Sequence, residues 1–140
     1  MMFYETASEL IKRWEGLRLN RYLCPAGVPT IGYGHTSGML PSRININQAE
    51  QYLQDDIVKH YLLMLRSSPV MIAESANRQA AILSFIFNLG IGNYNASTLK
   101  RRIDKNRWDD VPDQLDRWIF AGGIKLPGLI ARRKAEAYLI

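Results

Sequence analysis

The 140-residue sequence has little cysteine and no long apolar run. Its single cysteine, Cys24, excludes a disulfide within the chain and suits a reducing compartment. The longest apolar run, Tyr61 to Leu65, is far too short to span a bilayer, so we expect no transmembrane anchor and no stable membrane insertion. The first ten residues lack a basic stretch followed by an apolar one, which predicts that they are not a signal peptide.

Several chemical signatures are also absent. No glycine-rich phosphate loop precedes a helix, and no His, Cys, Asp and Glu residues have metal-ligand spacing. We therefore expect no cofactor and no metal. Of the two histidines, His35 follows TIGYG and is expected to brace a hairpin through a hydrogen bond or ion pair. His60 stands between Lys59 and Tyr61, and we expect it at the surface.

The length favours one domain, residues 1–140, with two lobes as an option, and 47% hydrophobic residues suffice for a core. The net charge of +5 is explained by solubility or by a polyanionic partner such as nucleic acid, an anionic membrane or a bacterial envelope. Basic residues cluster at 100–102, 105–107 and 132–134. They form solvated helix faces or attract anionic envelope polymers, and charge alone does not choose between these readings.

Residue patterns predict a β-rich region at about 17–38 and a helical lobe at about 45–140, with a cleft between them. An apolar stripe from Ala7 to Trp14 predicts a first helix, capped at Thr6 or Ser8 and ended by Gly16. Prolines and glycines after Gly16 indicate short strands and tight turns. Later helices are expected from Asn45 or Asn47 to Leu65, from Ser75 to Phe87, from Ser97 to Ile103, from Pro112 to Phe120, and from Pro127 or Gly128 onward, the last burying Ala131, Ala135, Tyr138 and Leu139.

One polar residue, Glu15, stands at the junction of these regions, and two others follow it in the sequence. Glu15 lies in the last turn of the first helix, where the helix dipole disfavours negative charge, and it is a candidate general acid. Cys24 and Thr30 follow closely and are candidates for positioning a nucleophile. Without convergence, the three are a surface acid, a small core thiol and a turn threonine.

Motifs along nearly the whole chain carry a family resemblance. They are Glu15-Gly16, Tyr22, Cys24 at an acid-or-thiol position, TIGYGH at 30–35, SFIFNLG at 84–90, STL at 97–99, RW at 117–118, AGG at 121–123 and LPGL-ARR-AE at 126–136. With these residues the chain resembles the phage-type lysozymes, glycoside hydrolase family 24, in their endolysin branch.

The resemblance implies an α+β lysozyme fold and a muramidase that cleaves the β-1,4 bond between N-acetylmuramic acid and N-acetylglucosamine in peptidoglycan. It implies an inverting reaction, used in host cell lysis, with Glu15, Cys24 and Thr30 as the catalytic set. It also implies accumulation in the host bacterial cytoplasm before release to the cell wall. We expect a monomer.

Among the three catalytic candidates, the chemical role of Cys24 is the one that leaves most alternatives. A thiol is mostly neutral at pH 7, and a nearby ionised Glu15 raises the pKa of such a thiol further. Three roles are open: a partly ionised base, a polar group that orients water with Thr30, or a thiolate that attacks the sugar. An inverting outcome favours the water-positioning role.

Further residues are expected to bind or shape the substrate site. Aromatic faces stack on sugars and amides read acetamido groups, so the substrate-binding candidates are Tyr33, Phe87, Asn88, Ser97 and Thr98. One or both of Phe85 and Phe87 belong to the core instead. Gly32 and Gly34 are expected to shape the cleft floor, beside His35.

Two other functions compete with the enzyme. A lysozyme-like binding module would hold peptidoglycan without cutting it, and a cysteine at an acid-or-thiol position is the only hint of lost activity. A basic nucleic-acid or membrane-active protein is the other alternative. The basic residues are spread over several helices without a DNA-reading motif, so we expect no nucleic-acid partner.

Overall fold

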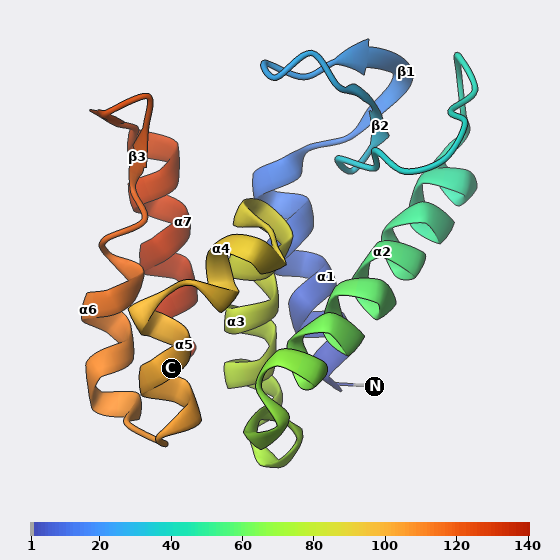
Figure 1. Cartoon of the computed structure of the whole chain (residues 1–140). Coiled ribbons are helices and arrows are strands. Elements are labelled where there is room, and N and C mark those ends of the chain that lie inside the picture. Colours follow the sequence, from blue (N-terminus) through green and yellow to red (C-terminus); the bar gives the residue numbers. More distant parts are fainter. Residues whose placement is uncertain (1) are drawn as a thin grey trace.

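The computed structural model describes residues 2–140, except the side chain of Met2, and has a small β hairpin beside a larger helical part (Figure 1). This confirms the α+β fold class. The elements in chain order are α1 (Met2–Glu15), β1 (Arg18–Leu23), β2 (Pro29–Gly32), α2 (Ile46–Ser67), η1 (Pro69–Ala73), α3 (Ala76–Leu89), α4 (Ile91–Asn95), α5 (Thr98–Asp104), η2 (Trp108–Asp110), α6 (Val111–Leu115), β3 (Phe120–Ala121), β4 (Ile124–Lys125) and α7 (Pro127–Tyr138).

Local capping explains where several helices begin and end. The Asn45 side chain accepts from the backbone N–H of Gln48, and the Gln48 side chain accepts from the Asn45 N–H, which forms a capping box at α2. Ser75 and Ser97 cap α3 and α5 through their side-chain oxygens. Gly16 follows α1 with a φ of 68°, a left-handed conformation that suits glycine. These predicted caps and this predicted end are confirmed, although α1 starts earlier than Thr6 or Ser8.

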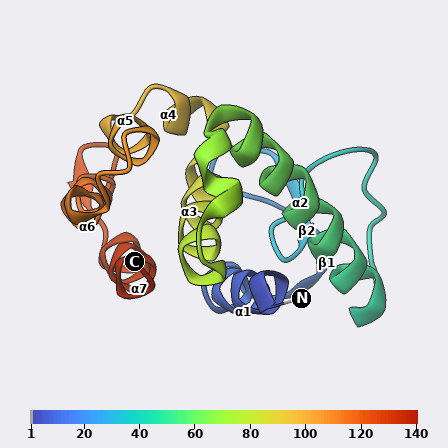
Figure 2. The same cartoon turned by 90° about the horizontal axis from the view of Figure 1, so that it is seen from below.

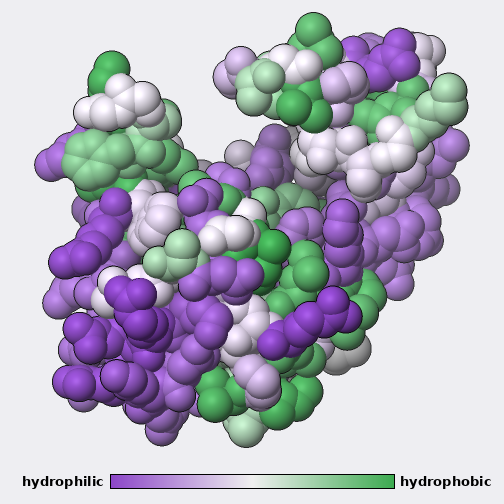
Figure 3. All heavy atoms as spheres, viewed as in Figure 1, coloured by the Kyte–Doolittle hydropathy of each residue, from purple (hydrophilic) through white to green (hydrophobic). Residues whose placement is uncertain are grey.

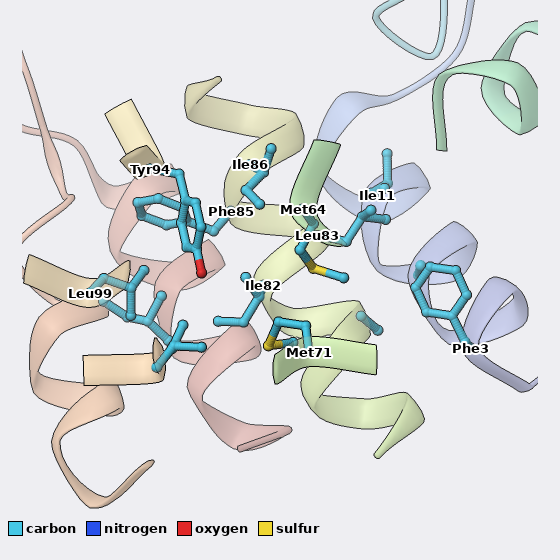
Figure 4. Packing of buried hydrophobic residues seen from close by; sticks show 14 of the residues in the cluster. Phe3, Ile11, Met64, Met71, Ile82, Leu83, Phe85, Ile86, Tyr94 and Leu99 are labelled. Atoms are coloured by element: carbon cyan, nitrogen blue, oxygen red, sulfur yellow. The ribbon is translucent and has the colours of Figure 1, made fainter. Parts of the chain in front are cut away.

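The helical core is built around α3, which packs against α1, α2, α4 and α7. Figure 2 shows α3 between α1 and α2 on one side and the group from α5 to α7 on the other. Eight consecutive residues of α3, 79–86, are buried. Phe85 lies beside Tyr94 (Figure 4) and contacts both Tyr94 and Trp118 edge-on. Because α3 is enclosed from several sides, its apolar residues extend around the helix instead of forming one stripe.

A second, smaller cluster lies under the hairpin. β1 and β2 pair antiparallel, with Tyr22 opposite Thr30. Ile31 of β2 packs with Leu40 and Ile44 of the following loop and with Ala49 of α2. This cluster fixes the hairpin on α2, at a distance from the helical core, and so creates a junction between two parts of the fold.

The region from Pro112 to Phe120 differs from the predicted helix. α6 ends at Leu115, and Phe120 lies in β3, which pairs with β4 across Gly122 and Gly123. The two glycines have φ values of 58° and 78°, so they close a two-residue hairpin instead of stopping a helix. The short helix α4, placed directly after Gly90, was also not predicted.

The buried face of α7 is the clearest error of the sequence reasoning. Tyr138 is 90% exposed and Ala131 is also exposed. The buried residues are instead Arg132, Arg133 and Glu136. Apolar periodicity fails here because the charged side chains are buried as mutual partners, which removes most of the cost of taking them out of water.

Candidate active site

A cleft of about 550 Å³ lies where the hairpin, the end of α1, α2 and the end of α3 meet. Figure 3 shows the molecule hollowed between the β1–β2 side and the β3–β4 side. Residues from five segments of the chain line this cleft: Glu15, Tyr22, Cys24, Pro25, Thr30, Gly34, Thr36, Ser37, Asp56, Lys59, His60, Phe87 and Asn88. The fold therefore brings Glu15, Cys24 and Thr30 to one cleft, which is the convergent one of the two alternatives that the sequence left open.

Glu15 is held from two directions. Nη1 of Arg132 donates to Oε1 of Glu15 at 3.1 Å, and Arg132 itself is 4% exposed. A Cβ atom on Gly34 would lie only 3.1 Å from Oε2 of Glu15, and the φ of Gly34 is 79°. Glycine at position 34 thus gives both the left-handed turn and the space in which the carboxyl group sits.

Arg132 is itself fixed by a buried polar network between α3 and α7. Its Nε and Nη2 donate at 3.3 Å to the hydroxyl and the carbonyl oxygen of Ser84. The Ser84 hydroxyl donates at 2.6 Å to Glu136, whose carboxylate also accepts from Arg133 at 3.0 Å. Nη2 of Arg133 reaches Asn88 at 2.8 Å. The network therefore ties Glu15 and Asn88, which both line the cleft, to α7.

Cys24 begins the tight turn between β1 and β2. Its N–H donates to the carbonyl of Val28 at 3.0 Å, and its own carbonyl accepts from the N–H of Gly27 at 2.8 Å. The N–H groups of Val28 and Ala26 stabilise negative charge on the sulfur and lower the pKa of the Cys24 thiol. The Thr30 hydroxyl lowers the pKa further, to a smaller extent, when its hydrogen turns to the sulfur.

These contacts exclude one alternative for Cys24 and correct one expectation. The thiol is half-buried in the cleft wall, so it is not a core residue. The direction of its pKa change is also opposite to the one expected from a nearby Glu15, because backbone N–H groups dominate and Glu15 is not among the causes. The turn therefore favours ionisation of the thiol more than the sequence indicated.

Thr30 is 3% exposed, and its hydroxyl donates to the carbonyl of Val28 at 2.9 Å. A hydroxyl has one hydrogen and two lone pairs. When the hydrogen is on Val28, the lone pairs of Thr30 can accept from a water in the cleft.

His35 braces the hairpin, as predicted. Its Nδ1 lies 2.8 Å from Oδ2 of Asp56 on α2, and its ring stacks on Tyr52 with centroids 4.1 Å apart. The backbone of His35 also exchanges two hydrogen bonds with Ile31. His35 thus fastens the turn that carries Gly34 to α2.

His60 is not the plain surface residue that was expected. It is half-buried, lines the cleft, and lies 5.0 Å from the ring of Phe87 between centroids. Its Nδ1 is 2.7 Å from the backbone carbonyl of Asp56. Lys59, beside it, also lines the cleft.

The other predicted substrate residues divide between the cleft and other places. Phe87 and Asn88 line the cleft, whereas Phe85 is fully buried in the core. Tyr33 lies outside the lining, with its hydroxyl 3.5 Å from Glu50 and the Lys12 ammonium over its ring. Gly32 is also outside this lining, and a Cβ atom added to it would meet Ile44 and Ala49.

Ser97 and Thr98 line a different hollow, of about 270 Å³, together with Arg117 and Trp118. The Ser97 hydroxyl is occupied in capping α5 and in donating to the carbonyl of Tyr94 at 2.6 Å. The two residues are therefore separate from Glu15, Cys24 and Thr30.

Arg132 is the important residue that the sequence reasoning placed only in a basic cluster. The motif ARR-AE contains it, and a spacing of four residues between Arg132 and Glu136 puts both on one helix face. That spacing was a usable signal for a buried ion pair. The contact with Glu15, 117 residues away, had no signal in a single sequence.

Comparisons with known proteins agree with this geometry. The family model described as "Phage lysozyme" matches residues 12–136. An endolysin of Acyrthosiphon pisum secondary endosymbiont phage 1 is 35% identical over 144 residues, covering 99% of this chain and 97% of that protein. A SAR-endolysin of Bacteriophage PS119 is 35% identical over 124 residues, covering 87% of this chain and 73% of its own.

Solved structures give the same result. The muramidase domain of SpmX from Asticaccaulis excentricus superposes with a TM-score of 0.85 at 31% identity, covering 95% of this chain and 92% of its own. The active form of the P1 phage endolysin Lyz has a TM-score of 0.85 at 26% identity, covering 99% of this chain and 84% of its own.

Among residues 2–140, no three His, Cys, Asp or Glu side chains gather so as to hold a metal ion. None of the described helices combines the length and hydrophobicity that crossing a bilayer requires.

Proposed function

Because the chain belongs to the phage lysozyme family and is a glycoside hydrolase that degrades peptidoglycan in host lysis, we propose a division of labour among its cleft residues. The bond cleaved is the β-1,4 bond between N-acetylmuramic acid and N-acetylglucosamine. The observation that carries the proposal is the convergence of Glu15, Cys24 and Thr30 on one cleft.

Glu15 is the proton donor for the leaving sugar oxygen. Arg132 donates to Oε1, so a proton on this carboxyl group is carried by Oε2, the oxygen beside Gly34. Gly34 lines the cleft, which supports Oε2 as the oxygen presented to the glycosidic bond. General acid catalysis at such a bond is worth about 10²- to 10⁴-fold in rate.

Cys24 and Thr30 hold and activate the attacking water on the opposite side of the sugar. Thr30 accepts a hydrogen bond from this water, and the Cys24 thiolate takes its proton as the new carbon–oxygen bond forms. The lowered pKa of Cys24 supports the base over a neutral thiol. The inverting outcome implied by the family resemblance supports the base over a covalent nucleophile.

Phe87 and Asn88 form part of the sugar-binding surface. Phe87 presents a ring at the cleft wall, and Asn88 is oriented by Arg133, which donates to its carbonyl oxygen at 2.8 Å. Fixing that oxygen turns the Asn88 NH₂ group outward as a donor for an acetamido carbonyl. Tyr33, Ser97 and Thr98 contribute at most to more distant parts of a long glycan.

The remaining expectations belong to the same proposal. The protein acts as a monomer on the cell wall, after accumulating in the host cytoplasm. Its net charge of +5 attracts it to anionic envelope polymers, an effect that weakens with salt.

Product analysis of digested peptidoglycan tests the proposal. We expect reducing ends at N-acetylmuramic acid, identified by mass spectrometry after reduction, and the α anomer as the first product in the proton NMR spectrum. A β anomer as first product would mean retention and would make Cys24 a nucleophile. Reducing ends at N-acetylglucosamine would contradict the bond assignment.

A further inference from the structure

One part of the cleft wall has no task in the proposed reaction. It consists of Lys59 and His60 on α2, which line the same cleft as Glu15, Cys24 and Thr30. We propose that Lys59 binds a carboxylate of the acidic substituent of muramic acid, and that His60 beside it accepts a hydrogen bond from an N–H group of the same substituent. This inference rests on the proposed function, because it names a feature of the substrate that the same cleft receives.

Lys59 is free to bind an external anion. Asp55 and Asp56 lie four and three residues before it, within reach on a helix. Asp55 accepts from Gln51 at 2.9 Å, and Asp56 is paired with His35 at 2.8 Å. Among residues 2–140, no carboxylate lies within 4.0 Å of the Lys59 ammonium.

The other charged groups of the cleft are already paired. Glu15 is paired with Arg132, and Asp56 with His35. Lys59 does not act as counter-ion to Cys24 either, since the groups that lower the pKa of this thiol are backbone N–H groups and Thr30. An unpaired cation is thus left facing the space that the substrate fills.

His60 provides a second polar group at the same place. A carbonyl oxygen only accepts, so the 2.7 Å contact with Asp56 places the His60 hydrogen on Nδ1. Nε2 then carries a lone pair and has no hydrogen-bond partner in the described chain, so it can accept from an amide N–H of the substituent but cannot bind the carboxylate itself. The ring contact with Phe87 fixes the plane of the imidazole in the cleft wall.

The chemistry of the substrate identifies the ligand. N-acetylated amino sugars carry no charge, so the carboxylates of a peptidoglycan strand are those of the muramic acid substituent. They belong to the stem peptide or, where the peptide has been removed, to the lactyl group itself. A cation beside the catalytic residues therefore recognises muramic acid and its substituent, and not the sugar ring.

The test compares Lys59→Met with wild type on native peptidoglycan and on peptidoglycan whose carboxylates have been converted to methylamides. Lys59→Arg keeps the charge, and Lys134→Met removes an exposed lysine of α7 outside this cleft. We expect Lys59→Met to raise KM about fivefold on native substrate and to leave kcat unchanged. A fivefold change corresponds to the upper end of the free energies measured for exposed ion pairs. We expect no such difference on the amidated substrate, a normal KM for Lys59→Arg, and a normal KM for Lys134→Met.

Peptide-free glycan strands, prepared with an amidase, separate the two carboxylate sources. If Lys59→Met also raises KM on these strands, Lys59 binds the free lactyl carboxylate as well, and if it does not, the stem-peptide carboxylates alone are its ligand. Equal KM values for wild type and Lys59→Met on native substrate would overturn the subsite. Failure of the wild-type protein to cleave any of these substrates would instead contradict the proposed function.

Discussion

Arg132 on the last helix and Glu15 at the end of the first helix form an ion pair across 117 residues, with Nη1 and Oε1 3.1 Å apart. The guanidinium group is nearly inaccessible to solvent, while the carboxyl group is partly open to the cleft. Ser84 holds two other nitrogen atoms of Arg132. The position of the proposed acid therefore depends on the packing of α7 against α3.

Replacing Arg132 by Met tests this positioning role. We expect kcat to fall about 100-fold, since a displacement of about 1 Å at a reacting group costs that much. KM should change little, because Arg132 contacts Glu15 and not the sugar. Steady-state kinetics on purified peptidoglycan measures the two parameters separately.

Arg132→Lys is the control for this substitution. Lysine keeps the positive charge but cannot keep the planar set of contacts with Glu15 and Ser84. We expect partial recovery of kcat. A loss of activity that appears only as raised KM would show that Arg132 binds substrate and does not position the acid.

Replacing Gly34 by Ala tests whether Oε2 of Glu15 needs the space that this glycine leaves. A Cβ atom added at Gly34 would lie 3.1 Å from this oxygen, whereas one added at Gly38 meets nothing within 4 Å. Both glycines have similar φ values, 79° and 81°, so Ala at either position costs about 1 kcal/mol of backbone strain. We expect similar losses of unfolding free energy for both variants, but a loss of kcat of about tenfold or more only for Gly34→Ala. Equal activities of the two variants would refute the close contact.

The pH dependence of Cys24 alkylation tests whether the thiol ionises more readily in the folded protein. Because the folded turn lowers the pKa of this thiol, the thiolate fraction at a given pH is larger in the native protein than in the unfolded chain. The rate of alkylation by iodoacetamide should therefore reach its midpoint at lower pH in native protein than in the same protein in urea. Alkylated protein should be inactive.

Two results would count against this account of Cys24. A native midpoint equal to or above that of the unfolded chain would remove the case for a thiolate base. Full activity after stoichiometric labelling would place the sulfur outside the reaction.

Local signals in the sequence were sufficient for much of the fold. Asn45, Ser75 and Ser97 cap helices because their short side chains reach backbone N–H groups within the next turn. The hairpin at Phe120 was missed because Gly122 and Gly123 indicate either a helix end or a two-residue turn. The choice depends on pairing between residues that flank the glycines, which only the folded chain shows.

Less of the site than of the helices could be predicted from the sequence. The resemblance to the phage-type lysozymes singled out Glu15, Cys24 and Thr30, and in the fold the three line one cleft. The role of Arg132 depends on a contact between the two ends of the chain, and the pKa of Cys24 depends on two backbone N–H groups in a turn. Neither property is encoded in a local pattern of residue types.

Replacing His35 by Leu tests how much its contact with Asp56, between the hairpin and α2, contributes to stability. Their contact at 2.8 Å is about nine-tenths shielded from solvent, so His35→Leu leaves a carboxylate without its partner. We expect a loss of about 3 kcal/mol in the free energy of unfolding, the lower end for a broken buried pair. Urea unfolding followed by circular dichroism measures it.

The double variant His35→Leu with Asp56→Leu completes this test. Removing both partners should cost less than the sum of the two single changes, because no unpaired charge is left. Strict additivity of the two losses would show that the pair contributes nothing as a pair.

The release of reducing ends from purified peptidoglycan by Glu15→Gln is the most direct test of the mechanism. Glutamine keeps the size of the side chain and can still accept from Arg132, but it has no acidic proton to donate. The account predicts a loss of cleavage of about 100-fold or more, with an unchanged thermal midpoint and continued sedimentation with cell walls. Cleavage by Glu15→Gln at the wild-type rate would contradict the assignment of Glu15 as the acid.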